Sequence, residues 1–129
     1  IHHTLARLRR HRGKTLESLL ADEDTYRAAL YDLQTVLEAI ADIANHLIVA
    51  LALRKPRNRA EAMLILGEAG VIPPSLAERL AQAQRMRNII VHGYLNILAN
   101  LVHRVIQEDL EDIETFCSAV IEHIEGERG

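Results

Sequence analysis

The 129-residue chain has no tryptophan, only three tyrosines and one phenylalanine, and few prolines and glycines. Leu, Ile, Val and Ala dominate the apolar residues instead. A sequence poor in aromatic and turn-forming residues and rich in aliphatic ones favours helices over a β-sandwich or a barrel. The length is enough for a single domain, residues 1–129, with a core of its own. We therefore expect an all-α fold, an antiparallel bundle of four to five helices.

Cysteine occurs once, as Cys117, which excludes an internal disulfide and fits a reducing compartment. No apolar run approaches the roughly 20 residues that a membrane-spanning helix needs. The first residues contain Arg and His but no apolar stretch typical of a signal peptide. These three absences predict a cytoplasmic protein with no membrane association.

Charge is unevenly distributed around a net value of −3. Basic residues gather in 7–14, 54–59 and 79–87, and acidic residues in 108–127. The net charge argues against indiscriminate coating of nucleic acid. Two interpretations of the runs stay open: solvated helix faces, or a basic side for a phosphate chain with an acidic side for something else.

Apolar residues recur at helical spacing in five segments: 1–20, 24–54, 59–69, 75–93 and 97–125. Gly13 predicts a bend or break in the basic first segment, and Asp22 to Asp24 a capped start for the second. Pro56 is expected to end the second helix. Asn58 and Ser75 are expected to cap the third and fourth, and Gly70 and Gly93 to stop them.

A polar stripe interrupts the second predicted helix. Glu38, Asp42, Asn45 and His46 fall at i, i+4, i+7 and i+8, beside its apolar seam. The stripe has no functional meaning if it faces solvent. If it faces inward, its carboxylates need a cationic partner, and Arg87 is the obvious candidate.

The segment Arg87-Asn88-Ile89-Ile90-Val91-His92-Gly93-Tyr94 holds a strong cation, an amide, an imidazole and a phenol. Arginine binds phosphate oxygens, and histidine suits proton transfer near neutral pH. This set suits RNA cleavage without a metal or other cofactor, because the 2′-hydroxyl supplies the nucleophile. Arg87 and His92 lie about 140° apart around an ideal helix, so they meet only if the helix distorts or a second subunit contributes.

The spacing of Arg87 and His92 alone is common by chance, and a single helical histidine is more often structural than catalytic. Zinc has little support, because the sequence contains neither a His-Glu-x-x-His nor a Cys-x-x-Cys pattern.

The same segment resembles the signature of HEPN-domain proteins, and the tyrosine two residues after the histidine resembles the HepT toxin branch. Three further stretches are similar to that branch: Asp42-Ile43-Ala44-Asn45-His46-Leu47-Ile48, Leu66-Gly67-Glu68-Ala69-Gly70-Val71-Ile72-Pro73, and Asp109-Leu110-Glu111-Asp112. The likeness runs from about residue 20 to 124. The chain departs from the family at Leu98, where an acidic residue is common, and its basic residues 7–14 have no match.

The resemblance implies a homodimeric, metal-independent endoribonuclease toxin of a type VII-like toxin–antitoxin pair. Arg87 and His92 would be catalytic, Asn88 would position the phosphate, and Asp42, Glu38 and Asn45 would support them. The resemblance also implies a small nucleotidyltransferase antitoxin of the MntA kind that transfers AMP to Tyr94. Adenylate phosphates there would occupy the cation and keep RNA out. The substrate would be tRNA or mRNA.

Two other hypotheses remain. The chain could be a non-catalytic helical module that binds a nucleotide or a partner and serves mainly as a substrate of the transferase. It could also be a purely structural bundle, which requires the polar stripe and the motif to face bulk water.

Overall fold

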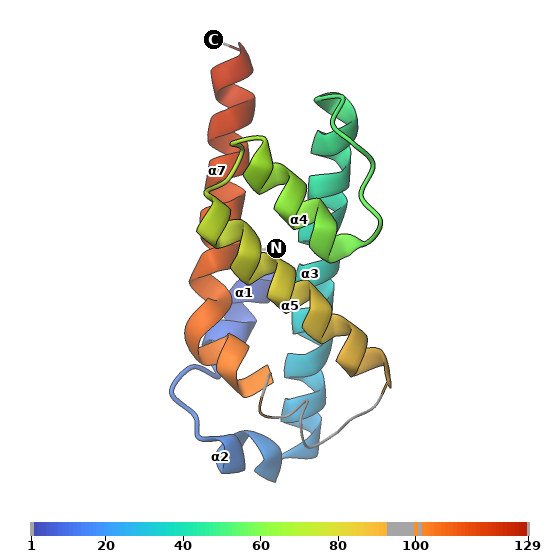
Figure 1. Cartoon of the computed structure of the whole chain (residues 1–129). Coiled ribbons are helices and arrows are strands. Elements are labelled where there is room, and N and C mark those ends of the chain that lie inside the picture. Colours follow the sequence, from blue (N-terminus) through green and yellow to red (C-terminus); the bar gives the residue numbers. More distant parts are fainter. Residues whose placement is uncertain (1, 93–99, 101, 129) are drawn as a thin grey trace.

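The computed structural model describes residues 2–92, 100 and 102–128. This part of the chain forms helices and turns with no strand. Its elements are α1 (His2–Arg9), α2 (Leu16–Ala21), α3 (Glu23–Ala50), α4 (Arg59–Glu68), α5 (Pro74–His92), the π-helical η1 (Val105–Asp109) and α7 (Leu110–Arg128) (Figure 1). The predicted all-α fold is confirmed. The predicted dimer is not tested by this single chain.

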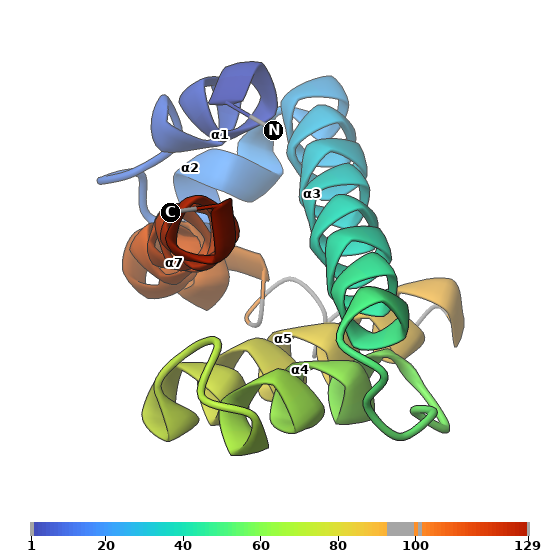
Figure 2. The ribbon, with the colours of Figure 1, turned by 90° about the horizontal axis from the view of Figure 1, so that it is seen from above.

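The helices surround one apolar core. Seen from above, α3 and α7 lie on opposite sides, with α1 and α2 closing one gap and the α4–α5 pair the other (Figure 2). The core side chains are aliphatic with one aromatic, and among those under 2% exposed are Leu33, Leu37, Ile40, Met63, Leu66, Leu76 and Phe116. The apolar spacing of the second and fourth predicted helices therefore supplies much of this core.

The long helix α3 begins where its sequence predicts. Asp22 is the N-cap, and its Oδ1 accepts hydrogen bonds from the backbone N–H groups of Asp24 (3.1 Å) and Thr25 (3.3 Å). Its end differs from the prediction, because the helix stops at Ala50, well before Pro56. Ala52 adopts a left-handed φ of 55°, and Leu53 N donates to Ile48 O at 2.9 Å. This turn, rather than the proline, terminates α3.

The predicted first helix is two helices. α1 ends at Arg9, Gly13 takes a φ of 90°, and Thr15 caps α2 by accepting from Ser18 N at 3.1 Å. The turn between them is held on η1, where Gln107 Oε1 accepts from Gly13 N at 2.7 Å. The break expected near Gly13 therefore occurs.

The α4–α5 pair carries the motif segment. Asn58 caps α4 by accepting from Glu61 N at 2.8 Å. Gly70, with a φ of 78°, ends it in a Schellman turn, because Val71 N donates to Leu66 O at 3.0 Å. α5 begins at Pro74, so Ser75 lies inside the first turn and is not the predicted cap.

The last helix is irregular at its start. The π-helical residues 105–109 lead directly into α7. The apolar spacing of this segment supplies its buried face, which includes Val105, Ile113, Phe116 and Val120. Ile124 continues the apolar spacing of this helix but is 36% exposed, because the C-terminal end of α7 projects past the other helices (Figure 1). Residues 97–99 and 101 of the predicted helix lie outside the described residues.

By length and composition alone, α3 could cross a membrane, which the sequence prediction did not anticipate. Its most apolar window is 39% buried within the bundle. Core helices of soluble proteins meet the same criterion, so this feature is weak evidence for a membrane span.

Candidate functional site

The motif occupies the C-terminal turns of α5. The backbone is helical from Pro74 through His92, so Arg87, Asn88 and His92 all stand on one unbroken helix. Their side chains, and the whole of Tyr94, lie outside the described residues. The predicted catalytic roles therefore stay predictions.

The helical backbone fixes how these positions are arranged around the axis. At 100° per residue, positions 85, 88 and 92 fall on one side of the helix, whereas position 87 lies about 140° from position 92. α5 stays helical up to His92, so no break between Arg87 and His92 brings their positions together. This arrangement favours a site to which a second copy contributes.

Neighbouring elements hold the motif end of α5 in place. Gln84 is 3% exposed, and its Nε2 donates to the Leu37 carbonyl of α3 at 2.8 Å. Farther back along α5, Arg79 donates to both carboxylate oxygens of Asp112 on α7, at 2.9 and 3.1 Å. The motif therefore extends from a helix anchored on two sides, beside the middle of α3.

The polar stripe of α3 faces outward in the single chain. Glu38, Asp42, Asn45 and His46 are all exposed. Asp42, Asn45 and His46 line a shallow hollow of about 370 Å³ together with the 81% exposed Val49. Whether Asp42, Glu38 or Asn45 orients Arg87 depends on a side chain outside the described residues, and it remains a prediction.

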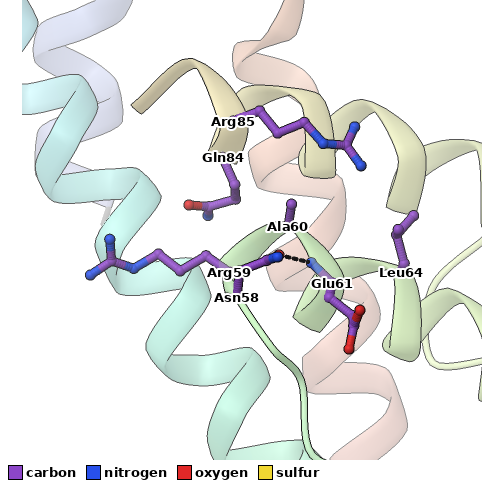
Figure 3. Close-up of a pocket in the computed structure, with 7 residues that line it drawn as sticks. All are labelled: Asn58, Arg59, Ala60, Glu61, Leu64, Gln84 and Arg85. Carbon is purple, nitrogen blue, oxygen red and sulfur yellow. Dashed lines mark hydrogen bonds between the residues drawn. The ribbon is translucent and has the colours of Figure 1, made fainter. Parts of the chain in front are cut away.

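A second hollow lies between α4 and α5, with a volume of about 410 Å³. One side of its lining is the start of α4, with Asn58, Arg59, Ala60, Glu61 and Leu64. The other side is α5, with Gln84 and Arg85 (Figure 3). We call it the α4–α5 groove. Arg85 stands two residues before Arg87, so the groove adjoins the motif.

Four arginines and one carboxylate set the electrostatics of the groove: Arg59 and Arg85 line it, and Arg54 and Arg57 pair with its Glu61. Glu61 accepts hydrogen bonds from Arg57 N and Arg54 Nη1, both at 3.1 Å, and from Arg57 Nε at 3.1 Å. The backbone hydrogen bond from Arg57 is the largest cause that lowers the pKa of Glu61 below its usual range. Glu61 is therefore an ionised but neutralised neighbour of Arg59.

The sequence did not single out the α4–α5 groove. Arg59 and Arg85 appeared in basic runs but received no individual role. Gln84 had a signal, because it falls at i+4 from Leu80 and i+8 from Leu76, two core positions of α5. A polar residue at core spacing marks a buried hydrogen bond.

Most of the charge runs neutralise one another across the fold. The basic N-terminal run pairs with acidic partners on α3 and α7: Arg7 with Asp32, Arg9 with Glu114 and Arg12 with Glu111. The open interpretation of a separate basic side and acidic side is therefore wrong for these residues. Within the part of the chain that the structure describes, no three His, Cys, Asp or Glu side chains are grouped as a metal site.

Comparison with known proteins gives consistent relatives. The family model for HepT-like ribonucleases matches residues 1–120. The mRNA nuclease HepT of Shewanella oneidensis strain MR-1 is 31% identical over 93 residues, which cover 72% of this chain and 70% of that protein. The tRNA nuclease HepT of Aphanizomenon flos-aquae is 33% identical over 79 residues, or 61% of this chain and 54% of that protein.

Several solved structures have the same fold as this chain and a related sequence. A toxin–antitoxin crystal structure with AMP-PNP superimposes with a TM-score of 0.83 at 26% identity, covering 94% of this chain and 91% of its counterpart. The tri-AMPylated Shewanella oneidensis HEPN toxin in complex with MNT antitoxin gives 0.83 at 27% identity, covering 94% and 90%. The family match over nearly the whole length and the likeness to two nucleases lead to one conclusion: the chain belongs to the HepT-like ribonuclease family.

Proposed function

We propose that this protein is the toxin of a toxin–antitoxin pair, an endoribonuclease that works without a metal through Arg87 and His92. The observation that carries the proposal is the family match, together with an intact Arg87 and His92 at the end of a firmly anchored α5. Both curated relatives bear the name of an RNA nuclease. RNA is accordingly the substrate we assign to the chain.

The chemistry needs only groups that the motif supplies. The RNA 2′-oxygen attacks the adjacent phosphorus, the O2′–P bond forms, and the P–O5′ bond breaks. His92 takes the proton of the 2′-hydroxyl as general base or gives a proton to the leaving 5′-oxygen as general acid, and water completes the other proton transfer. Arg87 stabilises the charge that develops on the phosphate oxygens, and Asn88 positions the phosphate. Neither step requires a metal-bound water.

We assign the working site to a homodimer. On an unbroken helix the positions of Arg87 and His92 point in widely different directions. A two-fold axis near the end of α5 would bring the arginine of one copy toward the histidine of the other. The exposed Asp42, Glu38 and Asn45 on α3 are then available to orient Arg87 within that interface.

Control of the toxin is assigned to Tyr94. A related toxin has been solved in a tri-AMPylated state with its MNT antitoxin. Tyr94 follows His92 by two residues, so adenylate phosphates on it would lie near the catalytic cation and compete with an RNA phosphate. The partner is a nucleotidyltransferase antitoxin of the MntA kind, and the pair would act in the cytoplasm.

The experiment is a cleavage assay with total RNA in excess chelator. It is run with and without ATP and the nucleotidyltransferase antitoxin of the MntA kind. Wild-type protein should cut RNA in chelator, and His92→Ala should lose at least about a hundredfold in rate while keeping its helical circular dichroism. Tyr94→Phe should cut RNA but escape inhibition by the transferase. Cleavage by a pure, folded His92→Ala protein would overturn the mechanism, and loss of activity in chelator would overturn metal independence.

An inactive wild-type protein that the transferase still modifies would instead support the non-catalytic module.

A further inference from the structure

Two arginines of the α4–α5 groove stand out because most arginines of the described chain form ion pairs. Eight arginines of the described chain form ion pairs: Arg7, Arg9, Arg12, Arg27, Arg54, Arg57, Arg79 and Arg104. Arg59 and Arg85 have no carboxylate partner among the described residues, and both line the same groove. Beside the motif, the groove therefore carries two positive charges that no carboxylate among the described residues compensates.

The remaining groups of the groove add to its attraction for anions. Glu61, the one carboxylate there, is occupied by Arg54 and Arg57. The groove also lies at the N-terminus of the ten-residue α4, where the helix dipole contributes partial positive charge. An anion that enters the groove meets two guanidiniums without a carboxylate partner among the described residues, and no unpaired carboxylate of the lining.

The two guanidiniums do not converge on one point. Arg59 extends from the start of α4 across α3, whereas Arg85 extends in the opposite direction along α5 (Figure 3). This arrangement suits two separate phosphates better than a single one. A chain of phosphates that runs along the groove can contact both guanidiniums, and positively charged grooves of this kind follow the backbone of single-stranded nucleic acids.

The groove and the proposed position of His92 lie along the same side of α5. Position 85 lies on the same side of α5 as positions 88 and 92, and seven residues of helix separate Arg85 from His92 by about 10.5 Å along the axis. A strand that lies along this side of α5 can therefore pass both positions without crossing the helix.

We propose that the α4–α5 groove binds the phosphodiester backbone of the substrate RNA beside the bond that is cut, with Arg59 and Arg85 on different phosphates. This inference rests on the proposed ribonuclease function. Gln84 lies at the inner wall, and its buried Oε1 has no partner among the described residues. Because that oxygen is buried, a ribose hydroxyl cannot bind it without a rearrangement of the groove. We therefore assign RNA binding to the two arginines.

The test uses His92→Ala protein, which holds RNA without cutting it, and a fluorescent single-stranded RNA. Binding is followed by anisotropy over a series of salt concentrations. Adding Arg59→Gln and Arg85→Gln should weaken binding at least several-fold and lower the salt slope of log K by about 1.4, which is about 0.7 for each phosphate that no longer meets an arginine. Each single change should give about half of that decrease in slope.

The matched control adds Arg10→Gln and Arg27→Gln, which remove the same charge elsewhere. Arg10 follows α1, on the opposite side of the bundle from α4 and α5 (Figure 2). Arg27 forms only an exposed pair with Glu23. The control should keep the parent slope. If both double variants lose the same RNA affinity and the same salt slope, binding depends on the total charge and not on the groove. That result would overturn the proposal.

Two further outcomes separate the possible sources of phosphate. If the groove variant keeps RNA affinity but is modified more slowly at Tyr94 by the transferase, the groove holds adenylate phosphates and the RNA proposal is wrong. If wild-type protein cuts RNA and the groove variant binds like its parent, the groove proposal fails while the ribonuclease function stands. If wild-type protein neither binds nor cuts RNA, both fail.

Discussion

Gly67 of α4 and Ala77 of α5 lie so close that a Cβ added to Gly67 would be 2.6 Å from the Cβ of Ala77. The Ala77 methyl is fixed to its helix and cannot rotate away. The absence of a side chain at Gly67 therefore sets how closely α4 packs against the helix that carries the motif.

Gly67→Ala should lower the free energy of unfolding by about 1–3 kcal/mol, because the two helices must separate. Urea unfolding followed by circular dichroism measures the change. Gly126→Ala is the control, since a Cβ there meets nothing within 4 Å. That change should leave stability equal or slightly higher, because Ala is the better helix former. Equal stability of Gly67→Ala and the parent would contradict the close packing.

The turn that ends α3 is strained at Ala52, whose φ of 55° suits glycine. Ala52→Gly should raise the free energy of unfolding by about 0.5 kcal/mol: it removes a left-handed penalty of about 1 kcal/mol but makes the unfolded chain more flexible. Thermal unfolding at neutral pH is the measurement.

The mirror experiment is Gly70→Ala at the end of α4, where φ is 78° and the space around the residue is open. It should lower the free energy of unfolding by about 1 kcal/mol. If Ala52→Gly also destabilises the protein, the left-handed conformation of Ala52 holds no strain that glycine relieves.

Local features of the fold were predictable because they depend on neighbouring residues. Asp22 and Asn58 accept hydrogen bonds from the first turn of a helix, so each residue indicates a helix start in the sequence. Gly70 allows a left-handed cap and indicates a helix end. Pro56 misled the prediction because a proline limits how far a helix can run, but it does not say where the helix stops. The turn at Ala52 has no such marker, since alanine normally favours a helix.

Contacts between distant residues were not predictable. The pairs Arg7–Asp32 and Arg79–Asp112 join residues far apart in sequence, so the charge runs looked like separate surfaces. The groove depends on the packing of α4 against α5, which places Arg59 and Arg85 in the lining of one hollow. The motif itself was recognisable because its residues are close together in sequence, whereas the convergence of Arg87 and His92 depends on tertiary or quaternary structure.

The cap of α3 makes stability depend on pH. The hydrogen bond from the Thr25 hydroxyl, aided by backbone N–H groups, lowers the pKa of Asp22 below its usual 3.8. The folded protein therefore binds this proton less readily than the unfolded chain does. The resulting stabilisation is present above about pH 4 and is lost as the pH falls through the lowered pKa.

Asp22→Asn keeps a capping oxygen but cannot ionise. It should be less stable than the parent at pH 7, and the difference should shrink steadily below about pH 4. Urea unfolding at a series of pH values measures both proteins. A gap that stays constant down to the lowest pH would show that the charge on Asp22 plays no part.

The placement of Arg87 and His92 around α5 leads to a test of subunit sharing. If the arginine of one copy works with the histidine of the other, a mixed dimer of Arg87→Ala and His92→Ala chains has one site that lacks both groups and one that is intact. Each homodimer has no intact site. Random mixing of the two inactive variants should then restore about a quarter of wild-type RNA cleavage, because half of the dimers are mixed and each has one working site of two. Chains with different affinity tags, co-expressed and purified through both tags, isolate the mixed dimer, which should have about half of the wild-type rate. If pure mixed dimers remain inactive, arginine and histidine must come from the same chain, and α5 or the residues after it must then bend to bring them together.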